Sequence, residues 1–208
     1  MLKKYYLITP GPTPVPARVA ARSSEPILHH RTKEFGDVFK AVQDGMKYVI
    51  KTKQDVMMLA GSGTSAMEAG VVNTLSPGDH VIVGSMGSFG ERFIKICEAF
   101  GIQVTAIREE WGTPVNPQKI ADALKKDPAV KAVLIQHTDT SSTTLNDVKA
   151  IADIVARTPA ILIVDSVSGL GGEEMFMDDW KVDVLVTGCQ KGLMTAPGVA
   201  MVAMSDKA

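Results

Sequence analysis

The sequence predicts a doubly wound α/β domain with seven mostly parallel strands, helices on both faces of the sheet, and an extended proline-rich arm in front. Three observations lead to this fold class. Strand-like and helix-like segments alternate from about residue 35 onward, as in βαβ units. Most strand-like segments are continuous apolar runs, which indicates strands covered on both faces. The N-terminal segment TPGPTPVP can continue neither a helix nor a central strand.

The elements are expected in a regular order along the chain. Strands are predicted at 55–61, 80–85, 102–107, 132–137, 160–165, 183–188 and 199–204. Helices are predicted between them, at 34–52, 64–75, 88–100, 116–126 and 145–157. Asn116 followed by Pro117 indicates a helix cap and a first helical residue. Asn146 and Asp147 mark another helix start. The chain therefore divides into an arm, residues 1–33, and one domain, residues 34–208.

The composition sets limits on the class of protein. With 208 residues, of which 45% are hydrophobic, the chain can bury a sizeable core. A formal net charge of −1 gives no reason to expect nucleic acid or an anionic membrane as a partner. Cys97 and Cys189 have no metal-ligand spacing, so we expect no bound metal and a reducing, cytoplasmic setting. No stretch approaches the roughly 20 apolar residues of a membrane span.

The most informative feature is the pair Asp165 and Lys191. Asp165 ends the apolar segment AILIVD, and Lys191 lies in the glycine-rich segment TGCQKGLMTAPG. Pyridoxal phosphate (PLP) chemistry uses such a pair, because a lysine amine forms a Schiff base with the cofactor and a carboxylate keeps the pyridine nitrogen protonated. An apolar setting also favours the neutral amine. Either residue has an ordinary alternative, since Asp can cap a turn and most lysines are solvated.

The segment LAGSGTSAMEAG predicts a phosphate-binding turn. It follows a strand and opens a helix. Gly61 and Gly63 let the backbone approach an anion, Ser62 and Thr64 add hydroxyl groups, and the helix N-terminus adds N–H groups. An ordinary strand-to-helix turn is the alternative. A dinucleotide site is less favoured, because the next strand ends at 83–85 without the acidic residue that would bind a ribose.

Other residues after strand ends are candidates for contacts with a flat cofactor. Phe89 could stack on the ring, and Val167 could press against it. Thr140 lies with Asp139 in the hydroxyl-rich segment HTDTSSTTLNDV and could donate to a phenolic oxygen. The alternatives are a core or surface phenylalanine and a helix-capping loop. Residues 29–31, His-His-Arg, are more consistent with a surface cluster than with a site.

Taken together, these segments resemble the class V aminotransferases of PLP fold type I, closest to the alanine–glyoxylate and serine–pyruvate group. The matching stretches are ITPGPTPVP, HHRTKEF, GSGTSAMEA, GSFGERF, HTDTSSTTLNDV, VDSVSGLGG and TGCQKGLMTAPG. They occur in the family's order and span nearly the whole chain. The resemblance implies these cofactor contacts: Ser62, Gly63, Thr64 and Gln190 at the phosphate, Phe89 on the ring, Thr140 at the phenolic oxygen, Asp165 at the ring nitrogen and Lys191 as the Schiff-base lysine. It also implies that the arm lines the substrate pocket.

The sequence departs from the family pattern in two places. The family usually has Gly where Thr143 stands, so the loop around Thr140 is expected to differ in shape. The family also continues into a small C-terminal domain, which supplies an arginine for the substrate carboxylate. We therefore expect residues 34–208 to be the PLP-binding large domain without that small domain.

The resemblance implies an aminotransferase that moves an amino group from a small amino acid, alanine or serine, to glyoxylate or pyruvate. It also implies a homodimer with the site between subunits. A cysteine desulfurase or lyase of the same fold is one alternative. Desulfurases usually have histidine before the lysine and on the ring, where this chain has Gln190 and Phe89. A non-catalytic PLP-binding fragment or subunit is the other.

Overall fold

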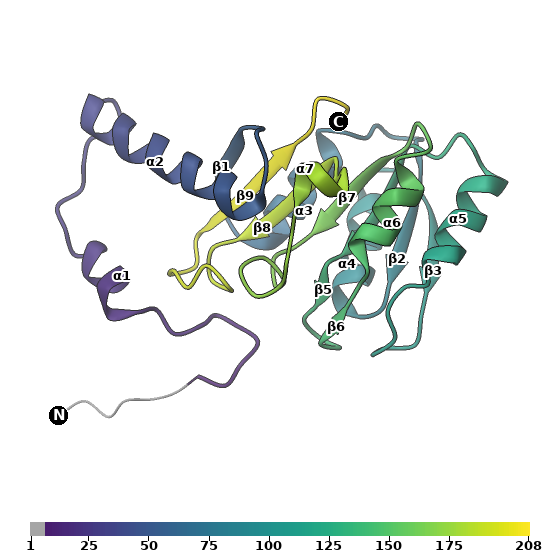
Figure 1. Cartoon of the computed structure of the whole chain (residues 1–208), viewed down its shortest axis with the longest axis horizontal. Coiled ribbons are helices and arrows are strands. Elements are labelled where there is room, and N and C mark those ends of the chain that lie inside the picture. The colour runs from purple at the N-terminus through teal and green to yellow at the C-terminus, as the bar shows by residue number, and fades with distance from the viewer. Residues whose placement is uncertain (1–6) are drawn as a thin grey trace.

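The structure is a computed structural model that describes residues 7–208. Its centre is a seven-stranded sheet with the order β1-β9-β8-β7-β4-β2-β3 (Figure 1). The strands are β1 (Val56–Ala60), β2 (His80–Ser85), β3 (Gln103–Arg108), β4 (Ala132–Gln136), β7 (Ile161–Asp165), β8 (Val184–Gly188) and β9 (Val199–Met204). Strands β3, β2, β4, β7 and β8 run parallel, and β9 runs antiparallel to both β8 and β1. The predicted seven-stranded, mostly parallel sheet is confirmed.

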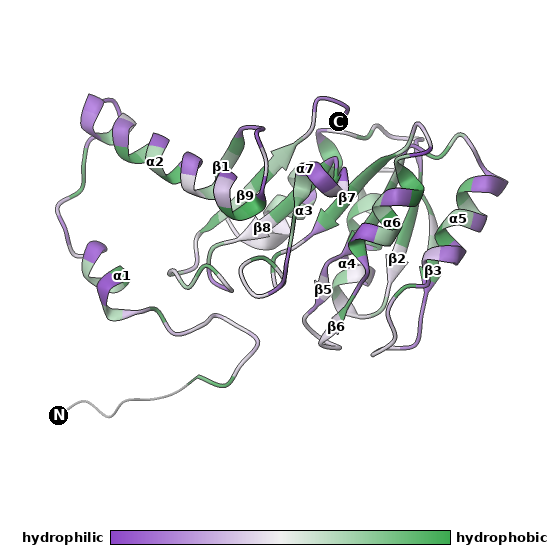
Figure 2. Cartoon of the chain, viewed as in Figure 1, coloured by the Kyte–Doolittle hydropathy of each residue, from purple (hydrophilic) through white to green (hydrophobic). Residues whose placement is uncertain are grey.

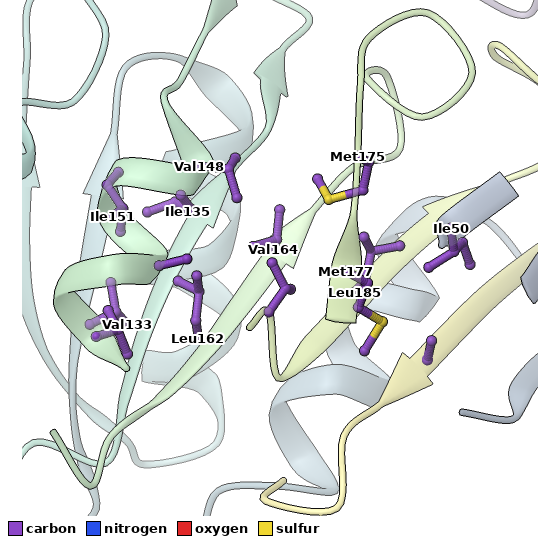
Figure 3. Close-up of a cluster of buried hydrophobic side chains, with 14 of the residues drawn as sticks. Ile50, Val133, Ile135, Val148, Ile151, Leu162, Val164, Met175, Met177 and Leu185 are labelled. Carbon is purple, nitrogen blue, oxygen red and sulfur yellow. The ribbon is translucent and has the colours of Figure 1, made fainter. Parts of the chain in front are cut away.

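Helices cover both faces of the sheet (Figure 1). The helices of the domain are α2 (Lys33–Ile50), α3 (Gly63–Val72), α4 (Ser88–Ala99), α5 (Pro117–Lys126), α6 (Val148–Val155) and α7 (Met177–Trp180). Alternate residues of each central strand face opposite cores. In β4, Val133 and Ile135 face the core that α6 covers with Val148 and Ile151 (Figure 3), whereas Ala132 and Leu134 belong to the core on the side of α3 and α4. This two-sided burial is why the strands read as continuous apolar runs.

Local sequence signals set the helix ends. Asn116 accepts a hydrogen bond from the Gln118 backbone at 2.9 Å, so the predicted cap is confirmed. Asp147 likewise accepts from the Ala150 backbone at 2.9 Å and caps α6. The solvent faces of α5 and α6 are polar while the strands beneath them are apolar (Figure 2). None of the described helices is long and apolar enough to cross a membrane.

Three elements differ from the sequence predictions. The prediction of an extended arm is wrong for Ala17–Arg22, which form helix α1. An alanine-rich run favours a helix directly after Pro16. The hydroxyl-rich segment after β4 is not a simple loop, since it forms a hairpin of β5 (Thr138–Asp139) and β6 (Thr144–Leu145). The short helix α7 was not predicted either. Several predicted strand and helix ends are too long by one to three residues.

The loop of the β5–β6 hairpin contains Thr143 in a left-handed conformation, with φ of 53°. Its side chain is exposed, so packing does not impose this conformation. A left-handed conformation costs an L-residue about 1–2 kcal/mol, and a β-branched residue is especially disfavoured there. Glycine adopts this conformation without that cost.

We expect Thr143→Gly to raise the free energy of unfolding by about 0.5–1 kcal/mol, because the relief of strain exceeds the extra chain entropy of glycine. Urea unfolding measures the change. Thr113→Gly is the control, since Thr113 is also an exposed loop residue and its φ is not positive. This second variant should lose stability. A loss of the same size in both variants would contradict strain at Thr143.

Candidate active site

A cavity of about 200 Å³ lies where the carboxyl ends of the parallel strands meet the start of α3 and α4. Its lining consists of Ser62, Gly63, Thr64, Met67, Phe89, Arg92, Asp165, Val167, Gln190 and Lys191. Eight of the nine residues predicted to contact a cofactor are in this set. Thr140 is the exception. A larger surface cavity of about 380 Å³ lies beside α5, but the smaller one gathers the predicted residues at the strand ends, where open α/β sheets bind ligands.

The first wall of the cavity is the N-terminus of α3. Ser62 is the N-cap residue, and Gly63 and Thr64 begin the helix. N–H groups in the first turn of a helix have no partner within the helix, so they are available to an anion. A Cβ on Gly63 would lie 2.6 Å from Val167 Cγ2. Only glycine therefore lets this turn approach the loop after β7 that carries Val167.

The second wall is the start of α4, which carries Phe89. The N-cap residue of α4 is Gly87, which has no side chain to satisfy the first N–H groups. The carboxylate of Asp139, which is fully buried, does this from the hairpin: Oδ2 accepts from the backbone of Phe89 at 2.9 Å and of Gly90 at 3.3 Å. Its Oδ1 accepts from the backbone and hydroxyl of Ser141 at 2.9 and 2.6 Å. Asp139 is thus a capping residue, and it fixes the backbone from which Phe89 projects.

Thr140 lies beside the cavity. Its hydroxyl is hydrogen-bonded to the hydroxyl of Ser168, a residue that the sequence interpretation did not single out. Either oxygen can be the donor. Because Ser168 follows Val167 directly, this bond connects the β5–β6 hairpin to the loop after β7.

Asp165 ends β7 and is only 3% exposed. Its Oδ1 accepts a hydrogen bond from the Val167 backbone at 2.9 Å. Burial raises the pKa of its carboxyl to about 7, and the nearby charge of Asp139 acts in the same direction. The Val167 N–H, Arg92 and Lys191 oppose that rise in pKa. A buried carboxylate of this kind calls for a cationic partner.

Lys191 follows β8, and its amine faces the same cavity. Burial lowers the pKa of the Lys191 amine, and the charge of Asp165 acts in the opposite direction. The Nζ atom donates a hydrogen bond to the Pro10 carbonyl at 2.8 Å. The lysine is therefore partly desolvated, which increases the fraction of neutral amine.

The N-terminal arm lies across the lysine loop. The Thr13 backbone donates to the Gln190 carbonyl at 3.0 Å, and the Thr13 hydroxyl donates to the Lys191 carbonyl at 2.9 Å. A Cβ on Gly11 would lie 2.5 Å from Lys191 Cδ. Glycine at this position therefore allows the arm to approach the lysine side chain closely.

The structure adds two residues to the predicted set and leaves one cluster outside it. Met67 and Arg92 line the cavity but were not predicted. Arg92 follows Phe89 by three residues, which places both on one face of α4, and this spacing was the available signal. Residues 29–31 are exposed and do not line the cavity, in agreement with a surface cluster.

The chain matches the family described as aminotransferase class-V over residues 5–208. It is 44% identical to the soluble hydrogenase 42 kDa subunit of Anabaena cylindrica, over 99% of this chain and 54% of that protein. It is 37% identical to the serine–glyoxylate aminotransferase of Hyphomicrobium methylovorum, over 98% of this chain and 51% of that protein. The chain thus spans about half the length of the curated relatives it matches.

A solved structure of alanine–glyoxylate aminotransferase from a Nostoc species has the same fold, with a TM-score of 0.94 and 28% sequence identity over 100% of this chain and 55% of that one. The fold class expected from the sequence, PLP fold type I, is therefore confirmed. From its motifs, its topology and these matches, the chain belongs to the class V aminotransferase family.

Proposed function

We propose that residues 34–208 form the PLP-binding large domain of an aminotransferase, which moves an amino group from alanine or serine to glyoxylate or pyruvate. The observation that carries the proposal is the placement of Asp165 and Lys191 on one cavity, with the carboxyl pKa raised to about 7 and the amine pKa lowered. The substrate class is supported by the names of two similar proteins, a serine–glyoxylate and an alanine–glyoxylate aminotransferase.

The residues present fit PLP. The α3 N-terminus, with Ser62, Gly63 and Thr64, provides N–H and hydroxyl groups for a phosphate. Phe89 and Val167 give the cavity apolar walls for a flat ring. The buried Asp165 carboxyl provides the anion that a protonated ring nitrogen requires. In this arrangement Gln190 would bind near the phosphate, Thr140 would bind near the phenolic oxygen, and Lys191 would hold the cofactor covalently.

PLP, when bound, supplies an aldehyde for the substrate amine and a ring that withdraws electrons from the α-carbon. The protein moves the proton. A neutral Lys191 Nζ can accept the proton from the substrate α-carbon and then donate it again. The amine would thus act first as base and then as acid in the 1,3-proton shift of transamination. With the cofactor bound, Asp165 would keep the ring nitrogen protonated through its charge, and Phe89 and Val167 would exclude water from the cavity.

Two alternatives are less well supported. A cysteine desulfurase or lyase would usually have histidine where this chain has Gln190 and Phe89. A non-catalytic PLP-binding subunit would need the same cavity but no proton carrier. The aminotransferase names of similar proteins favour the catalytic interpretation.

We also propose a homodimer and a cytoplasmic location. Helix α2 exposes apolar side chains on one stripe, with Val38 51%, Phe39 39% and Val42 44% exposed. A second copy of the chain would cover them. Sedimentation equilibrium at micromolar concentration tests this, and a monomer throughout would contradict it.

The cytoplasmic location stays a prediction from the two cysteines, both of which are buried and unpaired.

The first test concerns Lys191. After incubation with PLP, borohydride reduction and peptide mapping should place the pyridoxyl label on Lys191, because its amine is desolvated and lies in the cavity. Lys191→Ala should abolish the label. Lys95→Ala is the control, since Lys95 is exposed on α4, and it should keep the label. Labelling of another lysine in the parent chain would overturn this site assignment.

The second test concerns Asp165. Adding alanine or serine to the PLP-loaded chain should yield pyridoxamine phosphate and a 2-oxo acid. Asp165→Asn should slow this half-reaction by about 10²–10³-fold, because a neutral amide cannot stabilise the ring charge that develops during proton transfer. The covalent label on Lys191 should persist. An unchanged rate would exclude this role for Asp165.

The pH dependence of stability gives Asp165→Asn an independent readout in the chain without PLP. The carboxyl has a pKa of about 7 in the folded state and an ordinary pKa of 3.8. The folded state therefore binds more protons between these two values, and the parent loses stability as the pH rises through them. The variant should match the parent near about pH 4 and exceed it by at least about 1 kcal/mol near about pH 8.

Asp153→Asn is the control for this measurement. Lys149 lowers the pKa of the exposed Asp153 carboxyl, so its contribution has the opposite sign and that variant should gain nothing above neutral pH. A pH-independent difference between the parent and Asp165→Asn would contradict the raised pKa.

A further inference from the structure

Arg92 places a guanidinium group in the wall of the cavity, between its aromatic and its phosphate-binding parts. It lies on α4, three residues after Phe89, and its Cζ is 4.6 Å from the centre of the Phe89 ring. Its Nη1 donates a hydrogen bond to the Thr64 hydroxyl at 2.8 Å. The Arg92 side chain therefore contacts both α4 and the first turn of α3.

Most of the hydrogen-bonding capacity of this guanidinium is unused by the protein. Arginine has five N–H donors in a planar fork, and within residues 7–208 Arg92 makes one hydrogen bond and no ion pair. Arg108 provides a contrast, since its Nε and Nη2 donate to the two carboxylate oxygens of Glu91 at 2.9 and 3.1 Å. Arg92 has donors left for a ligand, whereas Arg108 is already engaged in a two-point ion pair.

Arg92 is also the lining residue best suited to neutralise the charge of a phosphate group. Ser62, Gly63, Thr64 and Gln190 line the phosphate-binding part, and all are neutral. Lys191 is the other basic residue in the lining, but burial lowers the pKa of its amine and the proposed function uses it for the covalent bond. A phosphate dianion in a partly buried site needs a cation that stays charged, and arginine stays charged at any physiological pH.

We propose that Arg92 binds the phosphate group of the cofactor together with Thr64 and the first turn of α3. This inference rests on the proposed function, because it assigns the phosphate of the same ligand. The fork of N–H donors matches two phosphate oxygens, which a lysine or an amide cannot do in the same geometry. The contact with the Phe89 ring holds the guanidinium in place and restricts its rotamers.

Comparing PLP with pyridoxal, which lacks the phosphate, tests this role. Equilibrium dialysis of the 208-residue chain should show that Arg92→Gln raises the Kd of PLP by about tenfold or more, because a charge-assisted bond is lost. The Kd of pyridoxal should change by less than about twofold. Arg92→Lys keeps the charge without the fork and should fall between the parent and Arg92→Gln. Lys95→Gln removes an exposed charge one turn along α4 and should change neither Kd.

Comparing the Kd values of PLP and pyridoxal distinguishes phosphate binding by Arg92 from a purely structural role. Equal weakening of PLP and pyridoxal in Arg92→Gln would mean that Arg92 only supports the Phe89 ring, and it would overturn the proposal. An unchanged Kd for PLP would also overturn it. If the parent chain binds neither ligand and takes no borohydride label, the proposed function itself fails, and this result is distinct from the other two.

Discussion

The site depends most directly on the buried carboxylate of Asp139. It accepts hydrogen bonds from the backbone of Phe89 and Gly90, which begin α4, and from the backbone and hydroxyl of Ser141 in the hairpin loop. A carboxylate at a helix N-terminus is favoured by the helix dipole, and loss of such a cap typically costs about 1 kcal/mol. Because α4 carries both Phe89 and Arg92, this one residue sets the position of an apolar wall and of the permanent cation.

A second constraint is the balance of charges that have lost their water. Burial disfavours the charged forms of both Asp165 and Lys191, and each partly restores the charge of the other. Burial and mutual attraction thus act in opposite directions on the pKa of each member of the pair. Asp139 is itself a nearby anion that raises the pKa of Asp165, and Arg92 opposes this effect. The residues that build the walls therefore also tune the pair.

Much of the fold and of the cavity could be predicted from the sequence, and the interactions of the site that could not be predicted share a cause. The apolar runs that end in Asp165 and Gly188 predict buried strands by themselves, because a strand covered on both faces has few polar residues. Gly63 could be predicted because it lies in a glycine-rich turn between a strand and a helix, where glycine lets the backbone approach an anion closely. The capping role of Asp139 could not, since it is 50 residues from Phe89 along the chain and only the tertiary structure brings them together. The contact of Arg92 with Thr64 could not be predicted for the same reason, because Thr64 lies on another helix. Helix α1 was not predicted, because the prolines that precede it favour an extended segment.

The close approach of the arm to Lys191 has a consequence for evolution. Gly11 has no room for a side chain beside the Lys191 methylenes, and Thr13 is bonded to the carbonyl groups of Gln190 and Lys191. Residues 11 and 191, which are 180 positions apart in the chain, therefore share one small space. Because the proposed function requires Lys191 itself, a side chain at position 11 could not be offset by a change at position 191, so glycine should be retained at position 11. In an alignment of many sequences, position 11 should therefore remain glycine wherever position 191 is lysine, although the two positions are 180 residues apart.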